Sequence, residues 1–302
     1  MGGMNKKISP FVGESPFTKE IKTLIQTLSA NNASVLLIGE RGSGKRFIAQ
    51  HIHYSIAKDF GYFFEINCKS FTKDQIFVAF DTVSRIIAYD QRITLFISSV
   101  DEMPVAVQKT FLELIEKAAD KGMNLKIICS IEKPIEEKIE SGDFLSALFC
   151  KINAVTLNVL PLRQRKEDIV PIAQNYLENF AKKSGIGFER FSESAKTAML
   201  NSFWIGNADE LINSVQRAFI VGKPPVINNA DLGLDDEKAV MHSVIDSEVD
   251  DKTLKTAVDM FKKEYITKVL EENGWNQTKT AKILGIQRTY VIRLINELQI
   301  RR

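Results

Sequence analysis

A glycine-rich stretch, GERGSGKR at residues 39–46, constrains the fold of this chain more than any other segment. The apolar run from Val35 to Ile38 precedes it, and an amphipathic helical pattern with Phe47, Ile48 and Ile52 follows it. In a strand, loop and helix of this kind, glycines turn backbone N–H groups toward a polyphosphate, and a lysine adds a positive charge. The stretch therefore predicts a P-loop fold, with a glycine turn that only packs a helix on a sheet as the alternative.

The predicted cofactor is ATP or ADP, held by the loop between strand and helix. The nucleotide-binding residues would be Gly39, Glu40, Arg41, Gly42, Ser43, Gly44, Lys45 and Arg46. The strict P-loop pattern has Ser or Thr after the lysine, where the hydroxyl holds magnesium, but Arg46 stands there. The sequence therefore does not support a magnesium site. We also predict no other metal site, because the three cysteines and three histidines lack the spacing of metal ligands.

Apolar segments alternate with helical patterns over the first half of the chain. Residues 93–97 and 125–129 are near-continuous apolar runs, which is typical of strands buried on both faces of a parallel sheet. With further strands at 63–67 and 155–159, this order predicts an α/β domain. Beyond Pro161 the strand pattern stops, and residues 168–222 are expected to form helices only, as a small all-α lid.

Charge is distributed unevenly over the C-terminal part. Residues 231–252 carry eight acids against two lysines, net −6, whereas residues 253–302 carry ten Lys or Arg against five acids, net +5. An acidic connector before a basic end favours a mobile linker and a tethered nucleic-acid-binding domain.

The C-terminal segment has the pattern of a helix-turn-helix. A short helix over 278–284 ends at Gly285, and a second helix begins near Gln287, with Ala281 at the crossing. The second helix of such a motif lies in the major groove, so we predict binding to double-stranded DNA, with a structural three-helix tail as the alternative. The predicted DNA-binding residues are Thr278, Lys279, Gln287, Arg288, Thr289, Tyr290 and Arg293.

Residues 253–273 form a predicted helix that precedes this motif. Its apolar stripe consists of Leu254, Val258, Phe261, Tyr265 and Val269. A single helix must bury such a stripe, and pairing with a second copy would also bring two recognition helices together. We therefore predict a homodimer through 253–273. No apolar run has the length of a membrane span, so we expect no membrane partner and a cytoplasmic protein.

Blocks of the chain resemble the bacterial enhancer-binding proteins that activate sigma-54 RNA polymerase. The blocks are FVGESPFTKEI, VLLIGERGSGKRFIAQHIH, MPVAVQKTFLELIE, PLRQRKEDIVPIA and NGWNQTKTAKILGIQRT. The resemblance, to members without an N-terminal receiver domain, implies an AAA+ domain over 1–166 and a helical lid over 167–230. An acidic linker over 231–252 and a Fis-type helix-turn-helix over 253–302 would follow. It also implies higher oligomers through the AAA+ domain and RNA polymerase as a candidate partner.

The chain departs from this family where the family carries catalytic charge. An Asp-Glu pair that holds magnesium and polarises water would align with Ser98 and Ser99. The two arginine-finger positions align with Leu145 and Lys151. An asparagine after the third strand becomes Glu132, and the lid arginine becomes Asp209. The loop with the Gly-Ala-Phe-Thr-Gly-Ala signature, which contacts sigma-54, has no counterpart between residues 67 and 94.

Asp101 and Glu102 could replace the missing acids only in a shifted register. A shift of three residues moves a side chain about 10 Å along a strand and turns it to the opposite face. The sequence therefore predicts no catalytic residues and a DNA-binding transcriptional regulator with a degenerate AAA+ domain. The alternatives are a working AAA+ ATPase that remodels RNA polymerase, and an interaction protein that modulates a competent paralogue.

Overall fold

The structure, a computed structural model, describes residues 9–57, 61–87 and 92–234, and residues 262–300 without 264, 268, 272, 285, 286 and 299. The chain divides into two compact units. The first contains the sheet, the helices around it, and the lid segments 162–196 and 204–232, and the second contains the C-terminal helices.

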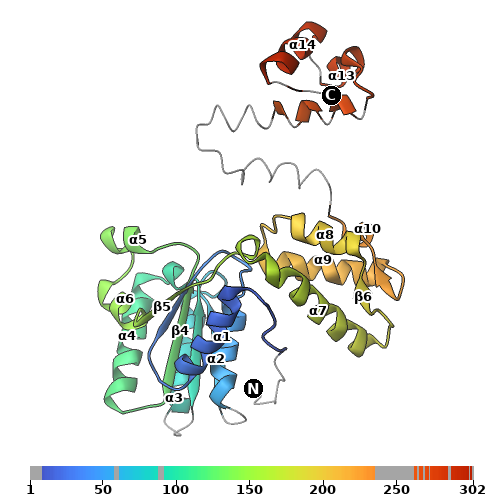
Figure 1. The fold of residues 1–302 in the computed structure, drawn as a ribbon. Helices are drawn as coiled ribbons and strands as arrows, with labels where there is room; N and C mark the ends of the chain where they lie inside the picture. The colour runs from blue at the N-terminus through green and yellow to red at the C-terminus, as the bar shows by residue number, and fades with distance from the viewer. Residues whose placement is uncertain are drawn as a thin grey trace. The chain divides into compact units, whose positions relative to one another are not determined.

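Five parallel strands form one sheet in the order β2-β3-β4-β1-β5 (Figure 1). The strands are β1 (Val35–Ile38), β2 (Tyr62–Asn67), β3 (Ile93–Ser98), β4 (Leu125–Ile131) and β5 (Val155–Asn158). The parallel α/β prediction is confirmed, because every pairing in this sheet is parallel. The C-terminal ends of β1, β3 and β4 therefore meet at one edge, next to the glycine-rich loop.

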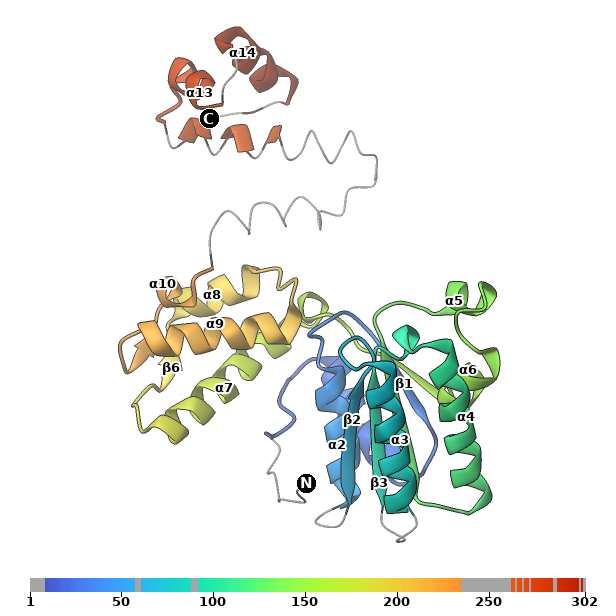
Figure 2. The same cartoon turned by 180° about the vertical axis from the view of Figure 1, so that it is seen from behind.

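Helices cover both faces of the sheet and bury two apolar cores. On one face α1 (Pro16–Ser29) and α2 (Lys45–Ala57) pack on Val35 and Leu37 of β1 (Figure 1). On the other face α3 (Lys73–Ile87), α4 (Val105–Asp120) and α6 (Ser146–Ile152) pack on Leu36 (Figure 2). Alternate side chains of each strand thus enter opposite cores, which explains the near-continuous apolar runs.

Two short elements connect the sheet to these helices. The 3-10 turn η1 (Val100–Glu102) lies between β3 and α4, and α5 (Glu136–Glu140) lies between β4 and α6. Both elements follow the C-terminal end of a strand, so they frame the edge of the sheet at which the P-loop lies.

The lid contains helices and also two short strands. Two 3-10 turns, η2 (Leu162–Gln164) and η3 (Lys166–Asp168), lead into α7 (Ile169–Ser184), α8 (Glu193–Asn201), α9 (Asn207–Val221) and α10 (Asn229–Leu232). The prediction of helices only was wrong, because β6 (Arg190–Phe191) pairs with β7 (Val226–Ile227). Strands of two residues are too short to produce a period in the sequence.

The C-terminal unit contains α13 (Gln277–Ile283) and α14 (Arg288–Glu297). Asn276 caps α13 by accepting hydrogen bonds from the backbone of Thr278 and Lys279. The core of this unit is formed by Ile266, Leu270, Leu294 and Ile300. Both helices begin within one residue of their predicted starts, whereas Gly285 lies outside the described residues.

The predicted dimer stripe is only partly described, because Leu254, Val258 and Phe261 lie outside the described residues. Of its other two members, Tyr265 is 47% exposed, whereas Val269 is buried in the unit of this chain. Val269 was therefore wrongly assigned to a surface that a second copy could cover. Among the described residues, no helix combines the length and the apolar character that crossing a membrane requires.

Asp168 joins the beginning of the chain to the beginning of the lid. Its fully buried carboxylate accepts hydrogen bonds from the backbone N–H groups of Glu14 and Ser15, at 2.8 Å each, and from the hydroxyls of Ser15 and Thr18. The guanidinium of Arg165 lies 3.8 Å from the same carboxylate. Because each of these donors is buried or half-buried, losing the acceptor would leave several polar groups without a partner.

We therefore expect Asp168→Ala to lower the free energy of unfolding by about 3–5 kcal/mol, the usual cost of leaving a buried charge without its partner. Urea unfolding followed by circular dichroism would measure the change. Asp120→Ala is the matched control, because Asp120 is exposed at the end of α4, and it should change the free energy by less than about 0.5 kcal/mol. Equal midpoints for the two variants would contradict the assigned role of Asp168.

Candidate nucleotide-binding site

The glycine-rich loop connects β1 to α2 in the conformation that its glycines allow. Gly42 and Gly44 have φ values of +73° and +101°, a region that side chains with a Cβ rarely adopt. At Gly44 no atom lies within 4 Å of the point where a Cβ would be, so the loop opens onto free space there. A phosphate group can approach the backbone at this point, and the loop fits the polyphosphate of a nucleotide.

Lys45 begins α2 and points back over the loop. Its ammonium donates to the carbonyl oxygens of Gly39, at 2.6 Å, and Glu40, at 2.8 Å. Burial lowers the pKa of Lys45 below its ordinary value, and Glu132 is the largest of the charges that act in the opposite direction. Two backbone carbonyl groups thus position Lys45, and the negative charge of Glu132, the residue after β4, acts on it.

The lid is hydrogen-bonded directly to the P-loop. The amide of Asn207, at the start of α9, donates to the carbonyl oxygen of Arg41 at 2.9 Å, and the N–H of Ala208 donates to Gly42 at 3.0 Å. A Cβ on Gly42 would lie 2.1 Å from the carbonyl oxygen of Gly206. Gly42 is therefore needed for the close approach of the lid as well as for its own φ.

Glu40 connects the loop to the segment before the lid. Its carboxylate accepts a pair of hydrogen bonds from Arg163, at 2.7 and 2.5 Å, and one from Asn207 at 3.1 Å. The hydrogen bond from Arg163 is the largest cause that lowers the pKa of Glu40 below its ordinary value. Glu40 thus contributes to the site by fixing the loop through its side chain.

A cavity of about 640 Å³ lies over the P-loop, between the strand ends and the lid. Its apolar and aromatic lining includes Phe11 of the N-terminal segment, Phe47 of α2, and Ile172, Tyr176 and Ile212 of the lid. Its charged lining includes Lys45, Lys69, Glu132 and Asp209. A cavity beside a P-loop that offers both apolar and charged side chains suits the base and the phosphates of a nucleotide. Of the eight predicted residues, Arg41 to Arg46 line it, whereas Gly39 and Glu40 support the loop from behind.

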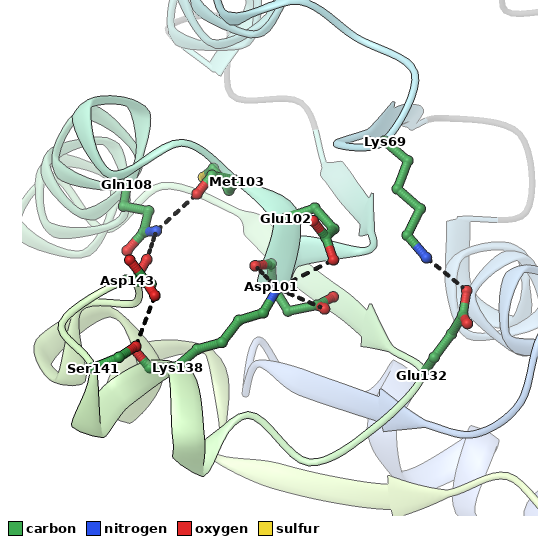
Figure 3. Close-up of polar contacts among 9 residues, drawn as sticks. All are labelled: Lys69, Asp101, Glu102, Met103, Gln108, Glu132, Lys138, Ser141 and Asp143. Carbon is green, nitrogen blue, oxygen red and sulfur yellow. Dashed lines mark hydrogen bonds and ion pairs between the residues drawn. The ribbon is translucent and has the colours of Figure 1, made fainter.

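The C-terminal end of β3 carries hydroxyls at the cavity. Ser98 and Ser99 line it, and Ser99 has a φ of +53° where the chain turns away from the strand. Asp101 and Glu102 are not among the lining residues. Lys138 of α5 binds them instead, donating to the backbone oxygen of Asp101 at 2.8 Å and to the Glu102 carboxylate at 3.1 Å (Figure 3). Ser98 and Ser99, the two positions that align with the family's Asp-Glu pair, therefore face the cavity, and Asp101 and Glu102 do not line it.

Four charged side chains at the cavity form two pairs across elements. Arg46 donates from Nε to both carboxylate oxygens of Glu65 on β2, at 2.8 Å each. Lys69 lies 3.0 Å from Glu132 (Figure 3), and this hydrogen bond is the largest cause that lowers the pKa of Glu132 below its ordinary value. Magnesium prefers oxygen ligands, mostly carboxylates and phosphates. An arginine and two serines do not supply such a set, so these residues do not fit the metal of a standard P-loop.

The two positions that align with arginine fingers are apart from the cavity of this chain. Leu145 is half-buried and packs against the apolar core, with its N–H bound to the side chain of Gln108. Lys151 is exposed on α6. Leu145 therefore has no charge to offer to the nucleotide of a neighbouring subunit.

The predicted DNA-binding residues all lie on the surface of the C-terminal unit. All seven are exposed: Thr278, Lys279, Gln287, Arg288, Thr289, Tyr290 and Arg293. On α14, Val291 and Leu294 point into the core. Arg293 forms an ion pair with Glu297 at 2.8 Å, whereas Arg288 has no ion pair among the described residues. Their exposure leaves these side chains accessible to a nucleic acid.

The sequence did not identify the residues that connect the site to other elements of the fold. Lys69, Lys138, Arg163, Asp168 and Asn207 all act through partners on other elements. Arg163, Asp168 and Asn207 lie within blocks that carry the family resemblance, PLRQRKEDIVPIA and WIGNADEL, which is a signal that could have found them. No comparable signal marks Lys69 or Lys138.

Comparison with known proteins adds family matches along the chain. A family model described as the sigma-54 interaction domain matches residues 12–162, one described as the AAA+ ATPase lid domain matches 163–243, and one described as the bacterial regulatory protein, Fis family, matches 257–293. These three matches follow the order that the sequence predicts.

Individual relatives match most of the chain. The regulatory protein AtoC of Escherichia coli is 26% identical over 94% of this chain, and the response regulator PilR of Pseudomonas aeruginosa is 27% identical over 91%. The chain spans 66% of the length of each of them. The solved structure of NtrX from Brucella abortus with ATP has a TM-score of 0.66 at 22% identity, over 96% of this chain and 70% of that one. This likeness supports the AAA+ fold, and the match over residues 12–162 shows that the chain belongs to the sigma-54 interaction domain family.

Proposed function

We propose that this chain is a sequence-specific DNA-binding transcriptional regulator whose AAA+ domain binds an adenine nucleotide and does not hydrolyse it. The observation that carries the second part is the arrangement at the end of β3. Ser98 and Ser99 face the cavity, while Asp101 and Glu102 are bound by Lys138. Without an acid to hold a metal or orient water, the site lacks groups that stabilise phosphoryl transfer.

Nucleotide binding itself needs fewer groups than hydrolysis. The open backbone at Gly44, the ammonium of Lys45 and the cavity suit the phosphates and base of ATP or ADP. Relatives support this, because NtrX of Brucella abortus has been solved with ADP and with ATP. The intact P-loop is also the observation that favours the second candidate function, a working ATPase.

The C-terminal unit supports the DNA-binding part of the proposal. A Fis-family match, the helices α13 and α14, and an exposed polar face on α14 agree with a helix that enters the major groove. Arg288 lies at the first turn of α14, where recognition helices contact bases. Dimerisation through 253–273 and higher oligomers through the AAA+ domain remain part of the proposal.

RNA polymerase remains a proposed partner because of the sigma-54 interaction domain match. Between residues 67 and 94, however, the sequence contains no Gly-Ala-Phe-Thr-Gly-Ala segment. We therefore propose that the chain regulates transcription without activating sigma-54 polymerase through that loop.

The first prediction concerns hydrolysis. We expect ATP turnover at least about 10³-fold below that of an active family member, since a missing trans arginine alone can have this effect. Phosphate release measured with magnesium, beside the active relative, would test it. A magnesium-dependent turnover that is lost in Lys45→Ala would establish the ATPase alternative instead.

The second prediction concerns binding. Replacing Lys45 by Ala removes the one ammonium over the P-loop backbone, so ADP affinity should fall about 10- to 100-fold, the usual range for a charge-assisted hydrogen bond. Isothermal titration calorimetry would measure it. Lys109→Ala removes an exposed lysine of α4 and should leave the affinity unchanged. If wild-type protein binds neither ADP nor ATP, the nucleotide part of the proposal fails.

The third prediction concerns DNA. Arg288→Ala should cost about 1–3 kcal/mol in binding to the preferred site and should relax specificity, as expected for a base-reading arginine. Gel-shift titrations against the selected site and a scrambled site would separate these effects. Arg217→Ala, on the exposed side of α9, removes the same charge from the chain and controls for non-specific attraction. Unchanged affinity and preference in Arg288→Ala would refute this placement of the recognition helix.

A further inference from the structure

Two of the acidic side chains that line the cavity are Glu132 and Asp209. Glu132 follows β4, and Asp209 lies in the first turn of α9, so the two approach the P-loop from the sheet and from the lid. A carboxylate oxygen of Asp209 lies 3.3 Å from the point where a Cβ on Gly42 would be. Among the described residues, no cation lies within ion-pair distance of Asp209, although its charge acts on Lys45.

These acids lie where the last phosphate of a triphosphate would extend. The lysine of a P-loop reaches the β- and γ-phosphates, and ligands of open parallel sheets lie outside the carboxyl ends of the strands. At that edge β3 ends in Ser98 and Ser99, and β4 is followed by Glu132. Glu132 is close enough to be the largest opposing charge on Lys45. A γ-phosphate would therefore meet a carboxylate there.

The cation beside Glu132 does not remove this conflict. Lys69 is bound to Glu132 at 3.0 Å (Figure 3), so a γ-phosphate would either break that ion pair or lie beside its carboxylate. The guanidinium of Arg46 is similarly bound to Glu65 on β2. A diphosphate ends at the loop backbone and Lys45, and it avoids both conflicts.

The usual magnesium ligands of a P-loop site are missing here. The metal prefers carboxylate and phosphate oxygens, and Asp101 and Glu102 are turned away to Lys138. The only hydroxyls at the end of β3 are neutral, and Arg46 brings a positive charge to the position of the usual metal-binding hydroxyl. The family's metal therefore does not fit this site.

We propose that the cavity selects a nucleoside diphosphate over a triphosphate and binds it without a metal ion, because Glu132 and Asp209 repel the γ-phosphate. This proposal rests on the nucleotide binding proposed above and specifies the ligand of that same site. It assigns to Glu132 and Asp209 a role in selectivity, and to the P-loop backbone and Lys45 the binding itself.

The test compares ADP, ATP and a non-hydrolysable ATP analogue by calorimetry on the full chain, first in EDTA and then with magnesium. We expect ADP to bind at least about tenfold more tightly than either triphosphate, as like charges at close range disfavour a ligand. Magnesium should change the ADP dissociation constant by less than about twofold, because Ser98, Ser99 and Arg46 stand where the acids and the hydroxyl that usually hold the metal would be.

Neutral variants test the two acids directly. Glu132→Gln and Asp209→Asn should each strengthen ATP binding while leaving ADP nearly unchanged, and the double variant should bring the two affinities within about threefold, because both repulsive charges are gone. Glu137→Gln removes an equal charge from the exposed surface of α5, outside the cavity, and should leave the selectivity unchanged. Thermal unfolding of each variant confirms that it is folded.

The outcomes separate the two proposals. Equal or tighter binding of ATP by the wild-type chain, or ADP binding that depends on magnesium, would overturn the selectivity while nucleotide binding stands. Absence of binding by every nucleotide would overturn the nucleotide site and the selectivity with it. The comparison of ADP with ATP on the wild-type chain decides whether the cavity is selective. The selectivity can therefore be refuted even if one of the variants fails to fold.

Discussion

The contacts of Arg163 and Asn207 with Glu40 hold the P-loop in its conformation. Gly42 and Gly44 adopt their positive φ values without strain, but glycines also leave a loop free to adopt many conformations, so contacts from outside the loop are needed to fix one of them. Here the lid supplies that support through side-chain and backbone hydrogen bonds. The cavity, the position of Lys45 and the approach of Asp209 all depend on this attachment, so the lid is part of the site.

The end of β3 shows that the fold there does not depend on acidic side chains at positions 98 and 99. Lys138 binds the backbone oxygen of Asp101 as well as the carboxylates of Asp101 and Glu102, and it thereby connects α5 to the turn η1. Exposed ion pairs of this kind add little to stability, so the backbone contact is the structurally important one. Packing on the apolar core beneath holds the sheet together, and none of that packing involves the groups that phosphoryl transfer needs. The fold of this domain therefore does not depend on the presence of the groups that phosphoryl transfer needs.

Local patterns in the sequence predicted the helices and strands. Contacts between residues that lie far apart in the sequence could not be predicted in the same way. The P-loop and the parallel strands were recognisable because glycines and apolar runs act over a few residues. Lys126 interrupts the apolar run of β4, yet it is fully buried and binds the carbonyl oxygens of Leu28, Asn31 and Ala33. That environment is formed by residues more than ninety positions away. Among the described residues before the helix-turn-helix, Ile266 and Leu270 are buried in addition to Val269, and the predicted stripe did not include these two.

A site that binds a nucleotide without hydrolysing it differs thermodynamically from the site of an ATPase that turns its nucleotide over. An ATPase resets itself with every turnover, whereas a site that only binds is in equilibrium with the free nucleotide. Its occupancy then depends on the nucleotide concentration relative to the dissociation constant, and the bound state gains stability in proportion to the logarithm of that ratio. Because the lid and the P-loop both line the cavity, a ligand there would stabilise their attachment to each other. The quantity that such a domain can report is therefore nucleotide concentration, and it can influence the DNA-binding unit only if the occupied and empty states differ in oligomerisation or DNA affinity.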